Sequence, residues 1–537
     1  MKNKKETLLI LIILITICII IFNRDKLYEA KYIEPKDALL AITINGEIST
    51  TFPTTNAYTG TVECTTGTGK VEWNGTKWVL TTSGITKGST KCNVIFRTPN
   101  FAETILANNT LKTPLTTPGK EVSAYKESEI TATGSTDVSS TYQAYYFTYG
   151  TGWEANGTKF NLTGAAVTSD TYANSYSSLV GKYLPMKSSY FTIRDFSAST
   201  AGKMKTTTNL YAVYYVVSAT QESFTYKTIY SNKNTTEAEL ASTVDDYGTS
   251  YYFRGSVKNN YVEFANKCWR IVRVGGDGSV KLILHNDNTA KAANPCASAN
   301  NSTSAAFARY SGSAYISSFN SNYDDNAYVG FKYGTVGASD YAATHANTNK
   351  STILTNLETW YTNNLAAYES VIDDNVWCND KTNVADTTFN PWNWSNVNGL
   401  GYAKNVTYYG ATQRLVSTSD SAGGTGPSLK CTGELSKITS KVGLITADEL
   451  AFAGYAYNIG NRTTYLQENA TDTYWWSLSP IEFYNGNAFV WIVRGSNGRF
   501  SAGTRVGNKL GVRPSISLKS TTNVTGEGTS DKPYKVI

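Results

Sequence analysis

The sequence predicts a multidomain protein with an N-terminal membrane helix, two all-β modules and a C-terminal α+β domain. The chain has 537 residues, and a domain typically takes about 100–200 residues, so several domains are expected. One uncharged aliphatic segment lies at residues 8–22, and strand patterns separated by Thr/Gly turns follow it. From about Tyr247, helical spacing joins the strand patterns, as expected of an α+β domain.

The segment Leu8–Phe22 is predicted to be an uncleaved signal anchor. It is shorter than the roughly 20 residues that cross a bilayer squarely. No small-residue cleavage site follows it, because charged residues begin at Arg24. Lysines precede it, and basic residues stay on the cytoplasmic side. We therefore expect residues 1–7 to be a cytoplasmic tail, residues 23–40 a spacer, and the bulk of this single-pass cell-membrane protein to be extracellular. A cleaved signal peptide is the alternative.

Composition excludes several classes of function. The net charge is +6 and only 17% of residues are charged, which leaves no basic footprint for a nucleic acid partner. Two histidines, His285 and His345, are too few for a His-rich zinc or haem site. His345 also has no partnered nucleophile in its Thr/Asn-rich loop. We expect neither a metal nor a cofactor. Tyr is abundant, with 38 residues against 19 Phe, and it suits half-buried polar surfaces.

Six cysteines follow the anchor, and their even number in an exported chain predicts disulfides. Pairing of sequence neighbours keeps each bridge within one predicted domain, which favours Cys64–Cys92, Cys268–Cys296 and Cys378–Cys431. Free thiols are the alternative. The sequence contains no Cys-x-x-Cys motif, so the spacing gives no support to thiol-redox or zinc-ribbon chemistry.

Residues 41–118 are predicted to form a β-sandwich module of immunoglobulin-like type. Its clearest element is the hairpin Val71–Leu80, in which Asn74-Gly75 has the residues that a two-residue turn prefers. That turn would pair Trp73 with Thr76. The residues expected on the buried face of the hairpin are Val71, Trp73, Trp78 and Leu80.

Residues 119–230 are predicted to be a second β module, followed by a linker at residues 231–246. The segment Glu154–Thr163 resembles Glu72–Thr81 at most positions, and self-similarity of this kind indicates repeated modules. A convergent hairpin is the alternative. We therefore expect a stalk built from two related modules.

Residues 247–537 are predicted to form the α+β domain. Alternating residues on either side of a Gly-rich turn predict a hairpin at residues 268–284. Apolar residues at helical spacing after Ser351, a good N-cap residue, predict a helix there. Thr446 and Glu449 have the spacing of a capping box that opens a short helix. Further strands are expected at residues 442–445, 488–493 and 511–518.

The order of motifs in this domain resembles a large, functionally uncharacterised family of bacterial surface proteins. The motifs are Trp269-Arg270-Ile271, Thr359-Trp360-Tyr361, Leu444–Glu449, Trp475–Pro480 and Gly511-Val512-Arg513-Pro514. Members of that family resemble proteins with the C-type-lectin-like fold, a fold that formylglycine-generating enzymes and hypervariable surface receptors share. The resemblance covers about half of the chain and implies a C-type-lectin-like domain. Members often have Arg where Leu478 stands, so no role of that Arg passes to this chain.

The last strands are predicted to form the recognition surface, because this region forms the ligand face in lectin-like folds. Aromatic residues and arginines also dominate binding hot spots. An alternative is that Trp475 and Trp476 fill the core and that the arginines are solvated. Arg513 is expected to fasten the last strand. The candidates for ligand binding are Tyr474, Trp475, Trp476, Tyr484, Trp491, Arg494, Arg499 and Arg505.

No set of residues predicts catalysis. The carboxylate pairs Asp373-Asp374 and Asp448-Glu449 are adjacent in sequence, so their side chains point in different directions and do not predict a glycosidase pair. Asp277, Asp324 and Asp325 lack the spacing of a calcium loop. We expect a binding protein rather than an enzyme.

The sequence thus predicts a membrane-anchored surface protein whose lectin-like domain binds a glycan or a protein at the cell exterior. Two alternatives stay open. A structural envelope component would contact only itself or the cell wall. An oxidase of the formylglycine-generating type would need two cysteines that converge on a metal. Cys378 and Cys431 are the candidates, although their pairing as a disulfide is favoured.

Overall fold

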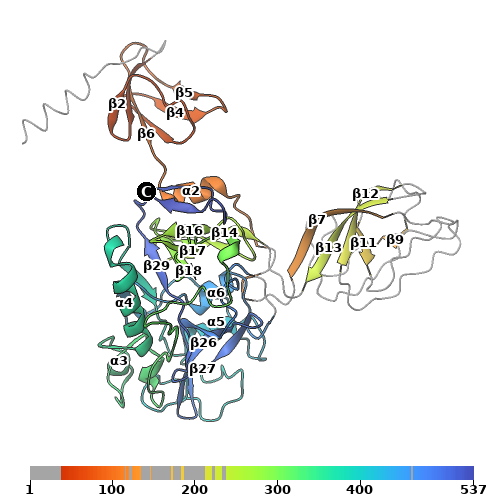
Figure 1. The fold of residues 1–537 in the computed structure, drawn as a ribbon, viewed down its shortest axis with the longest axis vertical. Helices are drawn as coiled ribbons and strands as arrows, with labels where there is room; N and C mark the ends of the chain where they lie inside the picture. Colours follow the sequence, from red (N-terminus) through yellow and green to blue (C-terminus); the bar gives the residue numbers. More distant parts are fainter. Residues whose placement is uncertain are drawn as a thin grey trace, which may run out of the picture. The chain divides into compact units, whose positions relative to one another are not determined.

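The computed structural model describes residues 38–114, 117–119, 238–460 and 464–537, together with strands between Ala124 and Asn232 (Figure 1). Strands dominate and helices are few, which confirms a β-rich chain with several sheets. The chain divides into two compact units, residues 1–104 and residues 105–537. Within the described residues, no helix combines the length and hydropathy that crossing a bilayer requires. The predicted anchor lies outside them.

The first unit contains a four-stranded sheet and a separate hairpin. The sheet order is β2-β1-β6-β3, with β1 parallel to β6. Val71 of the hairpin packs with Val94 and Phe96 of the sheet, so the two parts share one core. The strands are β1 (Leu39–Ile44), β2 (Glu47–Ser49), β3 (Thr59–Cys64), β4 (Thr68–Trp73), β5 (Trp78–Ser83) and β6 (Lys91–Arg97).

The β4–β5 hairpin has a longer turn than the sequence predicts. Trp73 pairs with Trp78, not with Thr76. Asn74 Oδ1 accepts hydrogen bonds from the backbone N–H groups of Thr76 and Lys77, at 3.1 and 2.9 Å, and this side-chain bonding stabilises the longer loop. The pairing moves by two residues, and an even shift keeps every side chain on its face. The predicted face is therefore confirmed, with Val71 opposite Leu80.

Strands between Ala124 and Asn232 form a further antiparallel sheet. Its order is β11-β12-β13-β7, and a separate pair is formed by β9 and β10. Strand-like runs in the sequence at residues 143–149 and 210–217 overlap β9 and β12. The predicted repeat at residues 154–163 lies outside the described residues. The strands are β7 (Ala124–Gly134), β9 (Tyr145–Tyr146), β10 (Thr171–Tyr172), β11 (Tyr183–Met186), β12 (Ala212–Ala219) and β13 (Phe224–Asn232).

The largest sheet has eight strands and begins at Glu239. Residues 239–245 were expected in a linker, but they form β14, because Leu240 and Ala241 are buried and the strand pairs with β15. The predicted hairpin is confirmed as β17 and β18. The strands are β14 (Glu239–Asp245), β15 (Gly248–Arg254), β16 (Tyr261–Phe264), β17 (Lys267–Val274), β18 (Val280–Asn286), β29 (Ser515–Leu518), β30 (Val524–Thr525) and β31 (Tyr534–Val536).

A second, six-stranded sheet carries the predicted recognition strands. Figure 1 shows β26 and β27 side by side, as their antiparallel pairing requires. Its strands are β19 (Ile316–Ser317), β23 (Thr407–Tyr408), β25 (Trp475–Tyr484), β26 (Asn487–Arg494), β27 (Arg499–Arg505) and β28 (Leu510–Gly511). Two short pairs complete the strands, β20 (Lys332–Tyr333) with β21 (Asn349–Lys350), and β22 (Asn375–Cys378) with β24 (Lys437–Ser440).

The predicted helix starts are confirmed. Ser351 Oγ accepts the backbone N–H of Leu354 at the start of α4. Thr446 and Glu449 form the capping box of α6, with both reciprocal hydrogen bonds present. Gly454 follows α6 with φ of 109°, the conformation that commonly ends a helix. The helices are α2 (Phe101–Asn108), α3 (Tyr341–Thr344), α4 (Thr352–Asn364), α5 (Gly410–Leu415) and α6 (Ala447–Phe452).

Replacing the cap residue gives a first testable prediction. Thr446→Ala removes the hydroxyl that accepts the Glu449 N–H at 3.0 Å, and loss of an N-cap costs about 1 kcal/mol of unfolding free energy. We expect chemical denaturation of the full chain to show this loss. Thr446→Ser keeps the oxygen and should retain most of the stability. Equal losses in both variants would show that the methyl group, not the cap, matters.

Two predicted strands are wrong in part. Residues 442–445 are buried, but only Gly443 forms a bridge, with Ser515. A Cβ at Gly443 would lie 2.4 Å from the Trp377 ring, so the segment is a tight crossing rather than a strand. Residues 511–518 split into β28 and β29, because Pro514 has no N–H to continue a ladder.

The three disulfides confirm the predicted pairing of sequence neighbours. They join Cys64 to Cys92, Cys268 to Cys296 and Cys378 to Cys431. The first two link residues of adjacent strands or loops around buried cores, since Cys92, Cys268 and Cys296 are at most 1% exposed.

Candidate functional site

The structure places the predicted tryptophans in the core instead of on a recognition surface. Trp475, Trp476 and Trp491 each have no exposed surface. Trp476 Nε1 donates to the Ser317 carbonyl at 2.9 Å, and Trp491 stacks on Phe500. An indole buried in this way offers no face to a ligand. The prediction that these three residues bind ligand is therefore corrected, and the core alternative holds for Trp475 and Trp476.

The other predicted residues fall into two separate groups. Tyr474 lies 5.5 Å from the Arg494 guanidinium, and Arg494 is paired in register with Arg499. Tyr484 and Arg505 lie at the other end of the sheet. Tyr474 precedes the first residue of β25 and Tyr484 is its last, so about 30 Å of extended strand separates them at roughly 3.3 Å per residue. These residues therefore do not form one patch.

A polar pocket of about 320 Å³ lies elsewhere in the domain, and no motif in the sequence predicts it. It is built between the loop that leads into 3-10 helix η3 (Asn326–Val329), the β20–β21 pair and the first turns of α4. Its walls contain amides, hydroxyls, two phenols and one amine. The residues that line it are Asn320, Ser321, Asn322, Tyr328, Tyr333, Lys350, Thr352, Thr355 and Asn356.

Hydrogen bonds hold the walls of this polar pocket in place. Asn320 Nδ2 donates to the carbonyls of Tyr328 and Gly330, at 2.7 and 3.1 Å. Ser321 and Thr352 hydroxyls lie 2.7 Å apart, which joins the loop to α4. Such bonding between the lining side chains preorganises the pocket, so a ligand would not have to order it.

The pocket combines hydrogen-bonding groups with aromatic rings and little net charge. The rings of Tyr328 and Tyr333 meet edge to face at 5.5 Å. Burial raises the pKa of the Tyr333 phenol, which keeps its proton for donation. Lys350 forms an ion pair with Glu358 at 2.7 Å, so the one cation of the lining already has a partner.

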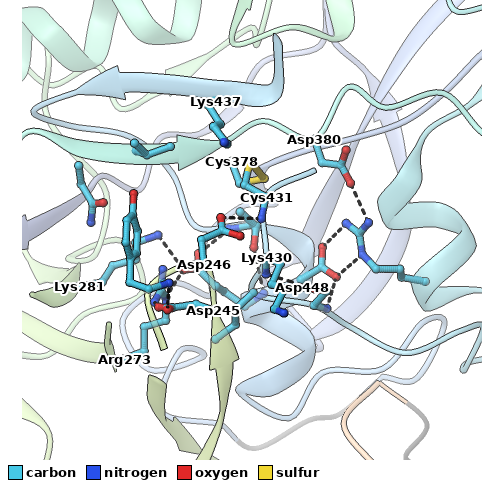
Figure 2. A pocket seen from close by; sticks show the side chains of 18 residues that line it. Asp245, Asp246, Arg273, Lys281, Cys378, Asp380, Lys430, Cys431, Lys437 and Asp448 are labelled. Atoms are coloured by element: carbon cyan, nitrogen blue, oxygen red, sulfur yellow. Dashed lines mark hydrogen bonds and ion pairs between the residues drawn. A yellow bond between two sulfur atoms is a disulfide. The ribbon is translucent and has the colours of Figure 1, made fainter. Parts of the chain in front are cut away.

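A second pocket, of about 400 Å³, has a different character (Figure 2). Most of its lining is charged, and opposite charges pair with each other. The acidic residues are Asp245, Asp246, Asp380, Asp448 and Glu449, and the basic ones are Arg273, Lys281, Arg414, Lys430 and Lys437. The disulfide Cys378–Cys431 also lies in the wall.

The first ion-pair cluster of this charged pocket centres on Glu449. Its Oε1 accepts from Lys281 Nζ at 2.7 Å and from Arg273 Nε at 3.0 Å. Arg273 also contacts Asp245 at 2.8 Å. Although burial opposes ionisation, the two cations lower the pKa of Glu449 to about 2. The carboxylate is thus held ionised and fully paired, which suits a structural role.

The second cluster centres on Arg414. Its guanidinium binds Asp448 in a bidentate manner, at 2.7 and 2.8 Å, and binds Asp380 at 2.7 Å. Burial opposes the charge, but both carboxylates raise the pKa of Arg414. The adjacent carboxylates Asp448 and Glu449 therefore point into two different clusters, as expected of neighbouring residues in a chain.

The remaining sequence candidates have structural partners. His345 is buried between Tyr341 and Tyr409, and its Nε2 lies 2.8 Å from the Gly401 carbonyl oxygen. Burial lowers the pKa of His345 to about 3, so the ring is neutral. Arg513 Nε donates to the Leu284 carbonyl at 2.9 Å, which fastens the chain after β28 to β18.

The predicted acidic residues are dispersed. Asp325 caps η3 by accepting the Ala327 N–H at 2.9 Å, and Asp277 accepts the Ser279 N–H at 2.9 Å. Asp324 contacts Lys404 at 3.8 Å on the surface. In the part of the chain that the structure describes, no group of three or more His, Cys, Asp or Glu side chains could hold a metal ion.

The motifs that carry the family resemblance lie mostly in the core. Trp269, Arg270, Trp360 and Arg513 are at most 1% exposed, and Trp269 meets Trp360 edge to face. The ordered motifs therefore mark how this domain packs, and they do not mark a ligand site. Comparison with known proteins gives no relative, because no protein-family model, no curated protein and no solved structure matches the chain.

Proposed function

We propose that this chain is a membrane-anchored surface protein in which residues 247–537 form a C-type-lectin-like domain that binds a glycan. The observation that carries the proposal is the polar pocket at the start of α4. Among the described residues, its lining has no aliphatic side chain and no carboxylate, but many groups that donate and accept hydrogen bonds.

Sugars present hydroxyl groups, each a donor and an acceptor, around a ring with an apolar face. The amides of Asn322 and Asn356 and the hydroxyl of Thr352 offer both kinds of partner. The half-buried Tyr333 supplies ring surface for the apolar face of a sugar, and Tyr328, which is 8% exposed, supports that ring edge to face. A volume of about 320 Å³ is at the small end of ligand pockets, which fits one or two sugar units at the end of a chain.

The cell-exterior location rests on two features of the sequence and the fold. The apolar segment at residues 8–22 follows a basic N-terminus. The described residues contain three disulfides, and disulfides persist mainly in oxidising compartments. Both support an anchored, exported protein with its bulk outside the membrane.

A glycan array probed with the full chain in detergent tests the proposal. We expect binding to neutral glycans with exposed terminal sugars, because the lining consists of neutral hydrogen-bonding groups and a single cation, Lys350, whose charge is balanced by Glu358. Binding confined to sialylated or sulfated glycans would contradict the pocket assignment. No glycan binding, together with ordered self-assembly in light scattering, would instead support a structural envelope component.

A further inference from the structure

The Cys378–Cys431 disulfide differs from the other disulfide of the same unit in its access to solvent. Cys268 and Cys296 are 0% and 1% exposed, so no reagent reaches them in the folded chain. Cys378 and Cys431 are both half-buried and line the charged pocket. Figure 2 shows their sulfur–sulfur bond in the pocket wall. A molecule that enters this pocket therefore meets a disulfide.

Two lysines flank this bond. Lys437 of β24 is the register partner of Cys378 in β22, and Lys430 precedes Cys431 in the chain. Both lysines line the same pocket. Cations beside a sulfur favour the thiolate over the thiol, which makes it a better leaving group. The pocket thus provides both access and charge for thiol–disulfide exchange.

The two sulfurs are not equivalent. Cys431 lies between the exposed residues Lys430 and Thr432, and its backbone N–H donates to Asp246 Oδ2 at 3.0 Å. Cys378 lies at the end of β22, between the buried residues Trp377 and Asn379. Attack is therefore easier at the Cys431 sulfur, with Cys378 as the leaving group.

We propose that the charged pocket is a thiol-exchange site for small thiols that carry an α-amino-acid group, such as free cysteine. The thiolate of the small thiol attacks Cys431 Sγ, a new sulfur–sulfur bond forms, and the Cys378–Cys431 bond breaks. The electron pair of the broken bond stays on Cys378 as a thiolate. A second small thiol then attacks the adduct, releases its symmetrical disulfide, and leaves Cys431 and Cys378 reduced.

The charges of the pocket define the ligand class. Lys437 forms an exposed ion pair with Glu434 at 2.6 Å, and such a pair is weak enough to yield to a ligand. Lys430 and Lys437 therefore attract the carboxylate of an amino acid, and the Asp246 carboxylate attracts its ammonium group. Asp245, Asp448 and Glu449 are already engaged by Arg273, Arg414 and Lys281, so they compete little for the ligand. A zwitterionic thiol matches these groups better than a neutral or a purely cationic thiol does.

Thiol exchange would release the segment of residues 429–431, which the disulfide ties to β22. Leu429 forms a bridge with Asp245 and packs beside Ala241 and Tyr252, and Lys430 and Cys431 complete the pocket wall. Breaking the disulfide removes the covalent link between this segment and β22. Exchange would therefore modify Cys431 and loosen one wall of the pocket.

Exchange on the native full chain tests this proposal. The protein is incubated without denaturant with cysteine, cysteamine or 2-mercaptoethanol, quenched with an alkylating reagent, and mapped by mass spectrometry. Rates are divided by the thiolate concentration and by the rate of each thiol with an unstructured peptide disulfide. We expect Cys378 and Cys431 to react while Cys268 and Cys296 stay paired, with a cysteine adduct on Cys431. Cysteine should be about fivefold faster than 2-mercaptoethanol.

The lysine variants separate recognition from simple exposure. Lys430→Ala with Lys437→Ala should abolish the advantage of cysteine over 2-mercaptoethanol. Lys532→Ala is the matched control, because Lys532 also forms an exposed pair, with Glu527 at 2.9 Å, and it should change nothing. Equal rates for all three thiols on the wild-type chain would overturn the ligand class. Exchange at Cys378–Cys431 no faster than at Cys268–Cys296 would overturn the site itself.

Discussion

Glu449→Gln should lower the unfolding free energy by about 3–5 kcal/mol, the usual cost of removing one partner from a buried ion pair. Lys281 is 3% exposed, and Glu449 is its one carboxylate partner among the described ion pairs. The variant therefore leaves a buried ammonium group without its direct ion-pair partner, and only the more distant charge of Asp245 remains to offset it. Arg273 keeps its ion pair with Asp245, so the loss of unfolding free energy comes mainly from Lys281.

The same group predicts acid sensitivity. The folded pKa of Glu449 is about 2, below the ordinary value of 4.5. A depressed acid pKa contributes stability above the unfolded value, and this contribution is lost as pH falls from 4.5 towards 2. Denaturant titration at several pH values should show a smaller loss between these pH values in Glu449→Gln than in the wild type. Glu527→Gln, in an exposed pair, is the control and should cost less than about 1 kcal/mol. Equal effects of both variants would contradict a special role for the Glu449 cluster.

Glu482→Gln should stabilise the protein at alkaline pH by roughly 3 kcal/mol, from about 1.4 kcal/mol per pKa unit. Glu482 is 7% exposed, and its Oε2 accepts a hydrogen bond from Trp394 Nε1 at 2.8 Å. Burial raises the pKa of Glu482 to about 7 against the Trp394 hydrogen bond, which lowers it. The folded state thus holds a proton that the unfolded state releases near pH 4.5.

The sign of the pH dependence follows from this raised pKa. Between about pH 4.5 and pH 7 the folded state binds more protons at this group, so its contribution to stability falls as pH rises. His345 has the opposite slope below pH 6.5, because its folded pKa is lowered. The difference between variant and wild type is therefore the quantity to measure. It should be near zero at pH 4 and largest at pH 8. A difference independent of pH would contradict an ionised, buried Glu482.

Local signals in the sequence predicted local structure well. The Ser351 cap, the Thr446–Glu449 capping box and the face of the Val71–Leu80 hairpin are confirmed, because each depends on residues close together in the chain. The predicted two-residue length of the hairpin loop was wrong, because Asn74 Oδ1 accepts a hydrogen bond from the backbone N–H of Lys77, beyond Gly75. The residue types alone do not show whether the two-residue turn or this longer loop is the more stable.

The candidate site could not be predicted in the same way. The prediction of ligand binding rested on the aromatic residues and arginines of the last strands. Trp475, Trp476 and Trp491, however, fill the core. The polar pocket joins residues from Asn320 to Asn356 through a loop, two short strands and a helix, and its Asn, Ser and Thr residues are common along the whole chain. Only the folded arrangement distinguishes them. The disulfide pairing was predictable because neighbouring cysteines share a domain.

The central claim is that the polar pocket, and not the predicted face of β25–β27, binds the glycan. The most direct test is a titration of the full chain with a glycan that the array identifies, comparing Tyr333→Ala with Tyr474→Ala. Both changes remove a phenol, one from the pocket and one from the predicted face. We expect Tyr333→Ala to raise Kd about tenfold or more, as loss of a hot-spot aromatic does, and Tyr474→Ala to leave it unchanged. The reverse result would contradict the claim.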